Sequence, residues 1–349
     1  MSLSPSTPVR PPRQSNIELL RIVAMFFVLI LHADYFSLGI PTALDLQATP
    51  ATFWARHGFE ALAIGSVNVF VLISGYFGIR PKARSFLNLL FQSLFMAITI
   101  HLLCVAFGSQ EMTGVTLQAC VFLRPVNWFL LAYVGLYILS PVLNAFVDQG
   151  NRRLHRNVLI GFFVLETIWG ATGAREMYAN GYSTLSFIGL YLLARYLRLY
   201  QPRPCRWSAW IHLLVFLLIT LLLTLLQGLA TGCGLSVPIL CEMNYINPLV
   251  IVQACALLLC FSKLSFTWQP VNWLAASAFS VYLVHINPNI LRPYFKKAVQ
   301  TIYDGYDGFH FLYLMGCFLV GVFLLCVVYD QLRLLLWRAL VWLHDRRRK

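Results

Sequence analysis

Four ionisable side chains fall in the first long apolar run of the chain, Ile17–Leu38: Glu18, Arg21, His32 and Asp34. Such groups cost roughly 2.5–3.5 kcal/mol each inside a membrane span, so they are candidates for function. Glu18 and Arg21 are three residues apart on one helix face, which favours an ion pair. Arg21 and His32 are eleven residues apart, so they point to the same side, about 16 Å apart along the helix axis.

This spacing suits chemistry that needs two groups at different depths. An arginine binds phosphates or carboxylates, and a neutral histidine serves as a general base near pH 7. The structural alternative is that Arg21 extends to the lipid headgroups while His32 hydrogen-bonds a neighbouring helix. Both interpretations are compatible with the spacing alone.

The composition places these residues in a membrane protein. Of the 349 residues, 59% are hydrophobic and 11% are charged, whereas soluble domains carry about 25% charged residues. We predict an all-α integral membrane protein, a bundle of about ten transmembrane helices. The predicted spans are Ile17–Leu38, Leu62–Ile79, Phe86–Phe107, Asn127–Phe146, Val158–Ala171, Ser183–Tyr200, Trp210–Thr231, Tyr245–Phe261, Trp273–Leu291 and Phe309–Val328.

The net charge of +13 comes from short basic clusters between the apolar runs, which argues against a nucleic-acid-binding face. With ten spans, 19 of the 26 Lys and Arg residues fall on the side that holds both termini. The positive-inside rule makes that side cytoplasmic. We therefore expect both termini in the cytoplasm.

Three regions follow from this pattern. Residues 1–15 are rich in Pro and Ser and read as a disordered tail, residues 16–331 form the transmembrane domain, and residues 332–349 form a basic amphipathic segment at the cytoplasmic interface. The nine cysteines include no CxxC pair, so we expect no metal site. Cys233 and Cys241 share a predicted outer loop, where a disulfide is one possibility.

Other polar groups lie inside later spans. Asn68, Ser74 and Tyr76 fall on the second span; they either orient His32 and donate to a developing negative charge or hydrogen-bond between helices. Glu166 lies in the fifth predicted span, where it faces a pore or marks a misplaced span.

Several stretches resemble one known family. An Arg and a His separated by ten residues in the first of ten helices resemble the acyltransferase-3 family of membrane acyltransferases. Further resemblances, in the family's order, are carried by Val67–Tyr76 (VNVFVLISGY), Trp128–Pro141 (WFLLAYVGLYILSP) and Ser280–His285 (SVYLVH). The family's basic motif after the second helix is present only as RPKAR, Arg80–Arg84.

The resemblance implies an acyl-CoA-dependent O-acyltransferase that uses acyl-CoA, most commonly acetyl-CoA, as co-substrate and no metal. The acceptor would be a hydroxyl of a cell-surface glycan or of its lipid-linked precursor, at a bacterial plasma (inner) membrane. His32 takes the catalytic position and Arg21 that of its motif partner. The supporting residues would be Glu18, Asn68, Ser74, Tyr76, Tyr282 and His285. The cytoplasmic groups that would bind the CoA phosphates are Arg80, Lys82, Arg84, Arg152 and Arg153.

Two other classes of function remain open from the residues. A secondary transporter or exporter of a lipid-linked sugar would use Glu18, Arg21, His32 and Glu166 as a charge relay. A structural subunit would not depend on His32. Acyl-CoA binding separates the first hypothesis from both.

Overall fold

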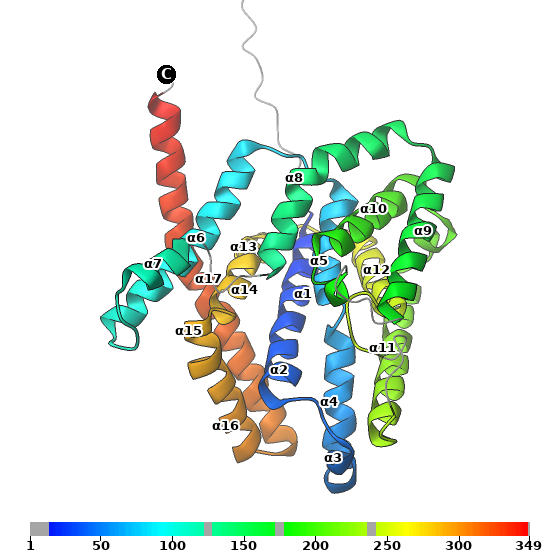
Figure 1. Ribbon diagram of the computed structural model, residues 1–349, viewed down its shortest axis with the longest axis horizontal. Helices are drawn as coiled ribbons and strands as arrows, with labels where there is room; N and C mark the ends of the chain where they lie inside the picture. Colours follow the sequence, from blue (N-terminus) through cyan, green and yellow to red (C-terminus); the bar gives the residue numbers. More distant parts are fainter. Residues whose placement is uncertain (1–13, 122–127, 172–177, 236–241, 348–349) are drawn as a thin grey trace, which may run out of the picture.

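The computed structural model describes residues 14–121, 128–171, 178–235 and 242–347, and every regular element in these ranges is helical (Figure 1). In chain order the elements are α1 (Ser15–Ala33), α2 (Tyr35–Leu38), α3 (Ala43–Ala48), α4 (Pro50–Ala63), α5 (Ser66–Phe77), α6 (Ala83–Ala106), α7 (Gly114–Val121), α8 (Trp128–Gln149), α9 (Arg152–Ala171), η1 (Ala179–Gly181), α10 (Thr184–Tyr200), η2 (Arg203–Arg206), α11 (Ala209–Gly232), α12 (Pro248–Ser262), α13 (Gln269–Ala275), α14 (Ala278–His285), α15 (Pro288–Ile290), η3 (Leu291–Lys296), α16 (Lys297–Gly305) and α17 (Gly308–Arg347). The predicted all-α class is thereby confirmed for the described residues.

In the part of the chain that the structure describes, fewer than ten segments are long and apolar enough to count as candidate membrane spans. Among the described residues, six segments are long and apolar enough to cross a membrane: Ser15–Leu38, Pro50–Phe77, Ala83–Ala106, Trp128–Gln149, Ala209–Gly232 and Gly308–Arg346. A seventh is Gln269–His285 with Pro288–Gly305, which bends by 68° at the break between them.

Three of the ten predicted spans are helices that fall short of these criteria. α10 has 17 residues and α12 has 15, fewer than the roughly 20 that a spanning helix needs. α9 has 20 residues, but its first turns carry Arg152, Arg153 and Arg156. The count of ten is therefore not confirmed, although each predicted span contains a helix.

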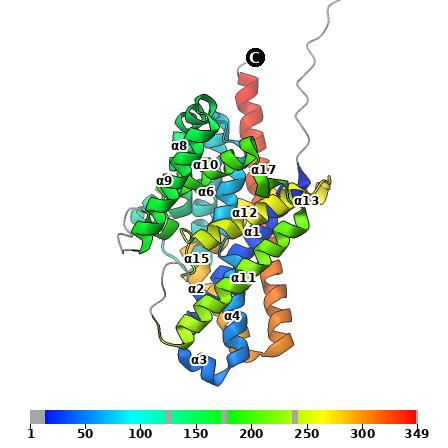
Figure 2. The same ribbon diagram turned by 90° about the vertical axis from the view of Figure 1, so that its right-hand side faces the viewer.

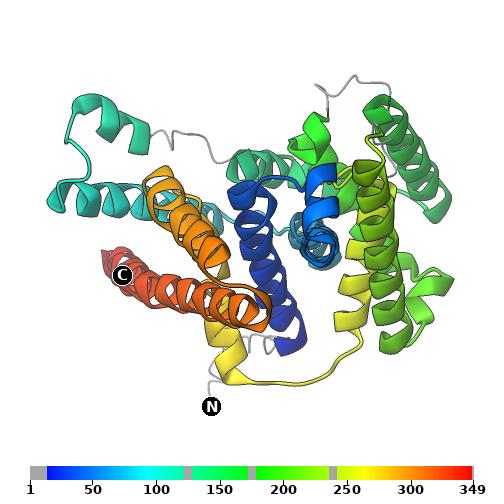
Figure 3. The same ribbon diagram turned by 90° about the horizontal axis from the view of Figure 1, so that it is seen from below.

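The first helix lies in the middle of the bundle. Seen from below, α1 stands between α16 and α17 on one side and α11 and α12 on the other (Figure 3). Helices α4, α5, α12, α13, α14 and α17 all contact it. Because α1 carries Arg21 and His32, this central place brings both side chains inside the protein.

Both ends of α1 are tied to neighbouring elements. At its start, the Ser15 hydroxyl donates to Oδ1 of Asn272 at 2.9 Å, and the Asn16 amide donates to the carbonyl of Phe261 at 2.9 Å. At its far end, Nε of Arg56 in α4 donates to Oδ1 of Asp34 at 2.6 Å. These contacts fix both the depth and the rotation of the helix.

Helices α5 and α10 approach each other closely at one glycine. A Cβ atom on Gly75 would lie 2.5 Å from the carbonyl oxygen of Tyr191, which is closer than atoms can pack. The glycine within the predicted SGY motif is therefore required by backbone contact, and it holds the helix that carries Ser74 and Tyr76.

The last helix is long and continuous. α17 has 40 residues and runs without a break through the boundary predicted at residue 331. At 1.5 Å per residue it is about 60 Å long, and its C-terminal part stands clear of the bundle on the side where α1 begins (Figures 1 and 2). The described ends of the chain therefore lie on the same side.

Candidate functional site

Two histidines from opposite ends of the sequence meet beside α1. Nδ1 of His32 lies 2.8 Å from Nε2 of His285, and Nδ1 of His285 lies 2.6 Å from the carbonyl oxygen of Val281, one turn earlier in α14. The His285 side chain is fully buried, whereas His32 is partly accessible. Because only His32 has accessible surface, it is the member of the pair that a ligand would reach.

The two hydrogen bonds also determine where the protons sit when both rings are neutral. A carbonyl oxygen only accepts, so Nδ1 of His285 carries a proton and donates it to Val281. Nε2 of His285 then has a lone pair and accepts from Nδ1 of His32. As a result, Nε2 of His32 is left with a free lone pair, which is the form a general base needs.

The α1 stripe predicted from the spacing lines a central cavity. The cavity has a volume of about 510 Å³. Glu18, Arg21, Met25 and Val28 line it from α1, and His32 follows one turn after Val28. The other lining residues are Val67, Phe70, Ser74, Leu89, Gln92, Phe129, Tyr133, Ala275, Ala276, Ala278, Phe279 and Tyr282.

Arg21 and Glu18 form the predicted ion pair at one end of this stripe. Nη1 of Arg21 donates to Oε1 of Glu18 at 2.6 Å, and the Arg21 side chain is 36% exposed while that of Glu18 is 10% exposed. The guanidinium therefore keeps several N–H donors available to the cavity. A pair with one accessible member is suited to receiving an anionic or carbonyl group.

Besides Glu18, two of the supporting residues line the cavity. Ser74 lies with its hydroxyl 3.2 Å from that of Tyr133. Tyr282 packs its ring between those of Phe129 and His285, with centroid distances of 5.6 Å and 6.1 Å. Tyr282 thus joins the cavity to the histidine pair.

Asn68 and Tyr76 lie away from the cavity lining, although they share α5 with Ser74. The amide of Asn68 donates to the carbonyl of Tyr245 at 2.9 Å. The Tyr76 hydroxyl accepts from Nη1 of Arg198 at 3.2 Å, and its ring lies 4.9 Å from that guanidinium. Tyr76 thus connects α5 to α10, which is the structural alternative predicted for it, whereas Asn68 ties α5 to the turn before α12.

The five predicted phosphate-binding residues are exposed and do not line the cavity. Arg80 and Lys82 come just before α6, Arg84 lies in its first turn, and Arg152 and Arg153 lie in the first turn of α9. Both helices start on the side of the bundle where α1 begins (Figure 1). Arg84 makes a weak exposed ion pair with Asp345 at 3.4 Å. The structure therefore places these basic groups on the face nearest to Arg21.

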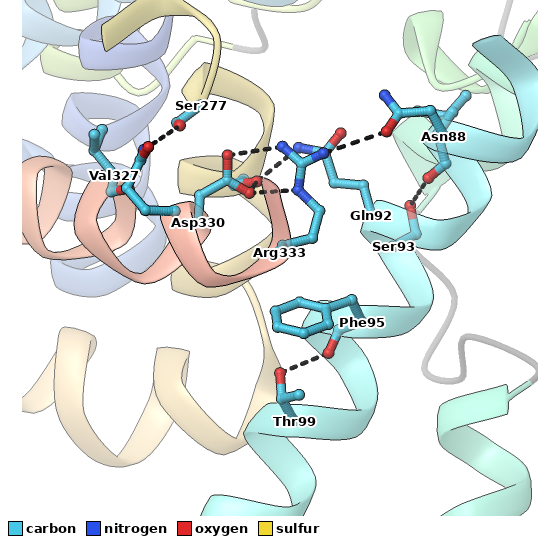
Figure 4. A network of polar contacts seen from close by, with 12 residues as sticks. Asn88, Gln92, Ser93, Phe95, Thr99, Ser277, Val327, Asp330 and Arg333 are labelled. Atoms are coloured by element: carbon cyan, nitrogen blue, oxygen red, sulfur yellow. Dashed lines mark hydrogen bonds and ion pairs between the residues drawn. The ribbon is translucent and has the colours of Figure 1, made fainter. Parts of the chain in front are cut away.

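A buried network at the cavity wall has no counterpart in the sequence predictions. Asp330 and Arg333 of α17 are 0% and 2% exposed and form a two-point ion pair, with Nε–Oδ1 and Nη2–Oδ2 distances of 2.7 Å and 2.8 Å. Ser280 donates to Oδ1 of Asp330 at 2.5 Å and accepts from Nε2 of Gln92 at 2.6 Å (Figure 4). The three-residue spacing of Asp330 and Arg333 was the available signal.

Other buried polar groups lie outside the cavity. Glu166 in α9 is 2% exposed and bonds to the hydroxyl of Ser186 in α10, so it faces a neighbouring helix. His57 bonds to the hydroxyl of Tyr35 near the far end of α1. Among the described residues no group of His, Cys, Asp and Glu side chains is arranged to hold a metal ion. Cys241, one half of the possible disulfide, lies outside the described residues.

The comparison with protein families gives one match that covers most of the chain. Residues 14–331 match a family model described as an acyltransferase domain. No curated protein and no solved structure matches the chain. The match runs from the start of α1 into α17, so it includes the histidine pair, the cavity and the basic face.

Proposed function

The chain belongs to the acyltransferase-3 family, and we propose that it transfers an acyl group from cytoplasmic acyl-CoA to a hydroxyl of a carbohydrate acceptor, with His32 as general base. The observation that carries the proposal is the His32–His285–Val281 chain of hydrogen bonds. It presents a lone pair on a partly accessible ring beside a cavity large enough for the arm of an acyl donor.

The proposed step needs a base because a sugar hydroxyl is a weak acid. Nε2 of His32 takes the hydroxyl proton as the oxygen attacks the thioester carbonyl. The new C–O bond forms, the C–S bond breaks, and the proton passes from His32 to the departing thiolate, which leaves as CoA thiol. The proton balance closes without metal or redox chemistry in this step.

His285 supports this step by orienting the base. It accepts from Nδ1 of His32, which holds the ring in the required tautomer and spreads the positive charge that forms during proton transfer. Ser74 lines the same cavity, but its hydroxyl donates to the carbonyl of Phe70 at 3.1 Å, so it would have to leave that partner to donate toward negative charge on the carbonyl oxygen.

The exposed basic residues favour entry of the acyl donor from the face where α1 begins. CoA carries several phosphate charges, and the exposed Arg80, Lys82, Arg84, Arg152 and Arg153 lie on the face where α1 begins. Charged groups of this kind attract polyanions from solution. The thioester arm would then pass Arg21 and reach His32 along the α1 stripe. In this proposal the basic face and both termini lie in the cytoplasm.

The acceptor would approach from the opposite side, since His32 lies toward the far end of α1. A cell-surface glycan or its lipid-linked precursor at a bacterial plasma membrane fits this direction, and acetyl is the acyl group we expect. The proposal therefore describes transfer across the membrane, in which the thioester arm enters from one side and only the acyl group passes on to the acceptor at the other.

Titration of purified protein with acetyl-CoA tests this function. A ligand that binds the folded state raises the unfolding temperature, so we expect stabilisation of the parent and release of free CoA. We expect His32→Ala to be stabilised by acetyl-CoA but to release no CoA. If the folded parent shows neither stabilisation nor CoA release, the proposal is wrong, and proton-dependent flux in proteoliposomes becomes the next measurement.

A further inference from the structure

The central cavity is lined by Gln92, whose amide is hydrogen-bonded through Ser280 to the buried Asp330. Gln92 of α6 lines the cavity and is 6% exposed. Its Nε2 donates to Ser280 at 2.6 Å. No described residue donates to its Oε1, and that oxygen is absent from the enclosed, unpartnered side-chain atoms. Oε1 of Gln92 therefore keeps free surface toward the cavity.

The direction of the network determines which end of the amide faces inward. Asp330 is paired with Arg333 and is an acceptor, so the hydroxyl of Ser280 donates its only hydrogen to Oδ1 of Asp330. The Ser280 oxygen then accepts, and it requires a donor from Gln92. The NH₂ group of Gln92 therefore points to Ser280, and its carbonyl oxygen is left without a partner in this network, which Figure 4 shows.

The network also makes this orientation rigid. Arg333 and Asp330 are held by two hydrogen bonds, and Nη1 of Arg333 reaches Oδ1 of Asn88 at 3.4 Å, one turn before Gln92 in α6. Ser280 comes from α14, so three helices fix a single amide. A buried polar network in which the donors and acceptors are matched is well suited to specifying one geometry.

We propose that Oε1 of Gln92 accepts a hydrogen bond from an amide N–H of the pantetheine arm of the acyl donor. This inference rests on the proposed function, because it assigns a contact to the acyl-CoA that the protein would use. The pantetheine arm carries two secondary amides, whose N–H groups need acceptors when they leave water. Gln92 lines the same cavity as Arg21 of α1 and Tyr282 of α14, along which that arm would pass from Arg21 toward His32.

The test compares two acyl donors on three proteins. The probes are acetyl-CoA and S-acetylpantetheine, which share the amide-bearing arm but differ in the nucleotide phosphates. The variants are Gln92→Met, which keeps the length of the side chain without the amide, and Gln331→Met as a matched control. Gln331 bonds to Ser277 and to the carbonyl of Val327 and does not line the cavity.

Dissociation constants come from ligand-dependent thermal stabilisation. For Gln92→Met we expect affinity to fall about tenfold for both probes, which is the loss expected for one hydrogen bond to a buried partner. For Gln331→Met we expect no change in affinity for either probe. An equal loss for both probes places the contact on the shared arm.

Three results would overturn the inference in distinguishable ways. If the parent binds both probes and Gln92→Met binds them equally well, Gln92 makes no such contact and the proposed function stands. If only acetyl-CoA affinity falls, the contact is to the nucleotide portion. If the folded parent binds neither probe, the proposed function and this inference fail together.

Discussion

The histidine pair and the Asp330–Arg333 pair are both buried polar contacts, yet they use their hydrogen-bonding capacity differently. Asp330 accepts from Arg333 through both carboxylate oxygens and also accepts from Ser280. The His32 ring makes one hydrogen bond, to His285, and its Nε2 has no hydrogen-bond partner among the described residues. One site is saturated by the protein, and the other retains capacity for a ligand.

Hydrogen-bonding capacity that is fully used within the protein indicates a stabilising group, and capacity that stays free indicates a reactive group. A buried ion pair that loses one member leaves an uncompensated charge, so the saturated pair is expected to control stability. His32 is partly exposed and its Nε2 has no hydrogen-bond partner among the described residues, so we expect it to control turnover rather than stability. Four substitutions, taken from the largest expected effect to the smallest, test the separation.

His32→Ala should abolish turnover while leaving the fold intact. Loss of a general base lowers kcat about 10²–10⁴-fold, and removal of a partly exposed ring creates no enclosed cavity. The measurement is CoA release, together with the unfolding temperature in detergent. His32→Gln serves as a control that restores side-chain volume without a base. Activity of either variant near the parent level would remove His32 from the reaction.

Asp330→Ala should do the reverse and destabilise the protein by about 3–5 kcal/mol, because Arg333 is then buried without its counter-charge. The free energy of unfolding is measured by denaturant titration in detergent. The double variant Asp330→Leu with Arg333→Met removes both charges, and we expect it to recover most of the lost stability. A single variant as stable as the parent would show that water or lipid compensates Arg333.

His285→Phe should lower kcat about 10–100-fold, by analogy with the loss of a hydrogen-bond partner that orients a metal-bound histidine. The Michaelis constant for acyl-CoA should stay the same, because His285 is fully buried and touches no ligand in this mechanism. His285→Gln keeps an oxygen that can accept from His32 and should recover part of the rate. Equal losses in both variants would reduce His285 to a packing role.

Asn88→Ala should have the smallest effect. Its contact with Nη1 of Arg333 is long, at 3.4 Å, and the two bonds to Asp330 remain. We expect a loss of less than about 1 kcal/mol in the free energy of unfolding and unchanged turnover. A loss as large as that of Asp330→Ala would show that Asn88, and not the carboxylate, holds the guanidinium.

Much of the site was predictable because it lies on one regular helix. The spacing of Glu18, Arg21 and His32 alone places them on one stripe, and the structure shows the Glu18–Arg21 ion pair and a cavity along that stripe. A helix converts sequence distance into spatial position with a fixed period. The same rule would have paired Asp330 with Arg333, but Asp330 falls two residues beyond the predicted last span.

Contacts between helices could not be read from the sequence in the same way. His32 and His285 are 253 residues apart, and only the family resemblance brought His285 into consideration. Gln92 and Ser280 are 188 residues apart and neither carries charge. Ser280 begins the stretch Ser280–His285 that resembles the family, but nothing in the sequence pointed to Gln92 as its partner. The span count differed because α10 and α12 have fewer residues than a spanning helix usually needs, and because α9 carries three arginines in its first turns.

The break in the ninth predicted span has an electrostatic consequence for the histidine pair. α14 ends at His285, and Pro288 begins the next short helix after the chain has turned. The last carbonyl groups of a helix carry a partial negative charge that is equivalent to about half an electron. If the span were continuous, that charge would lie at the membrane surface. Because the helix stops at His285, its negative pole lies at the ring that would share the proton in the proposed mechanism, and it would stabilise the cation formed there.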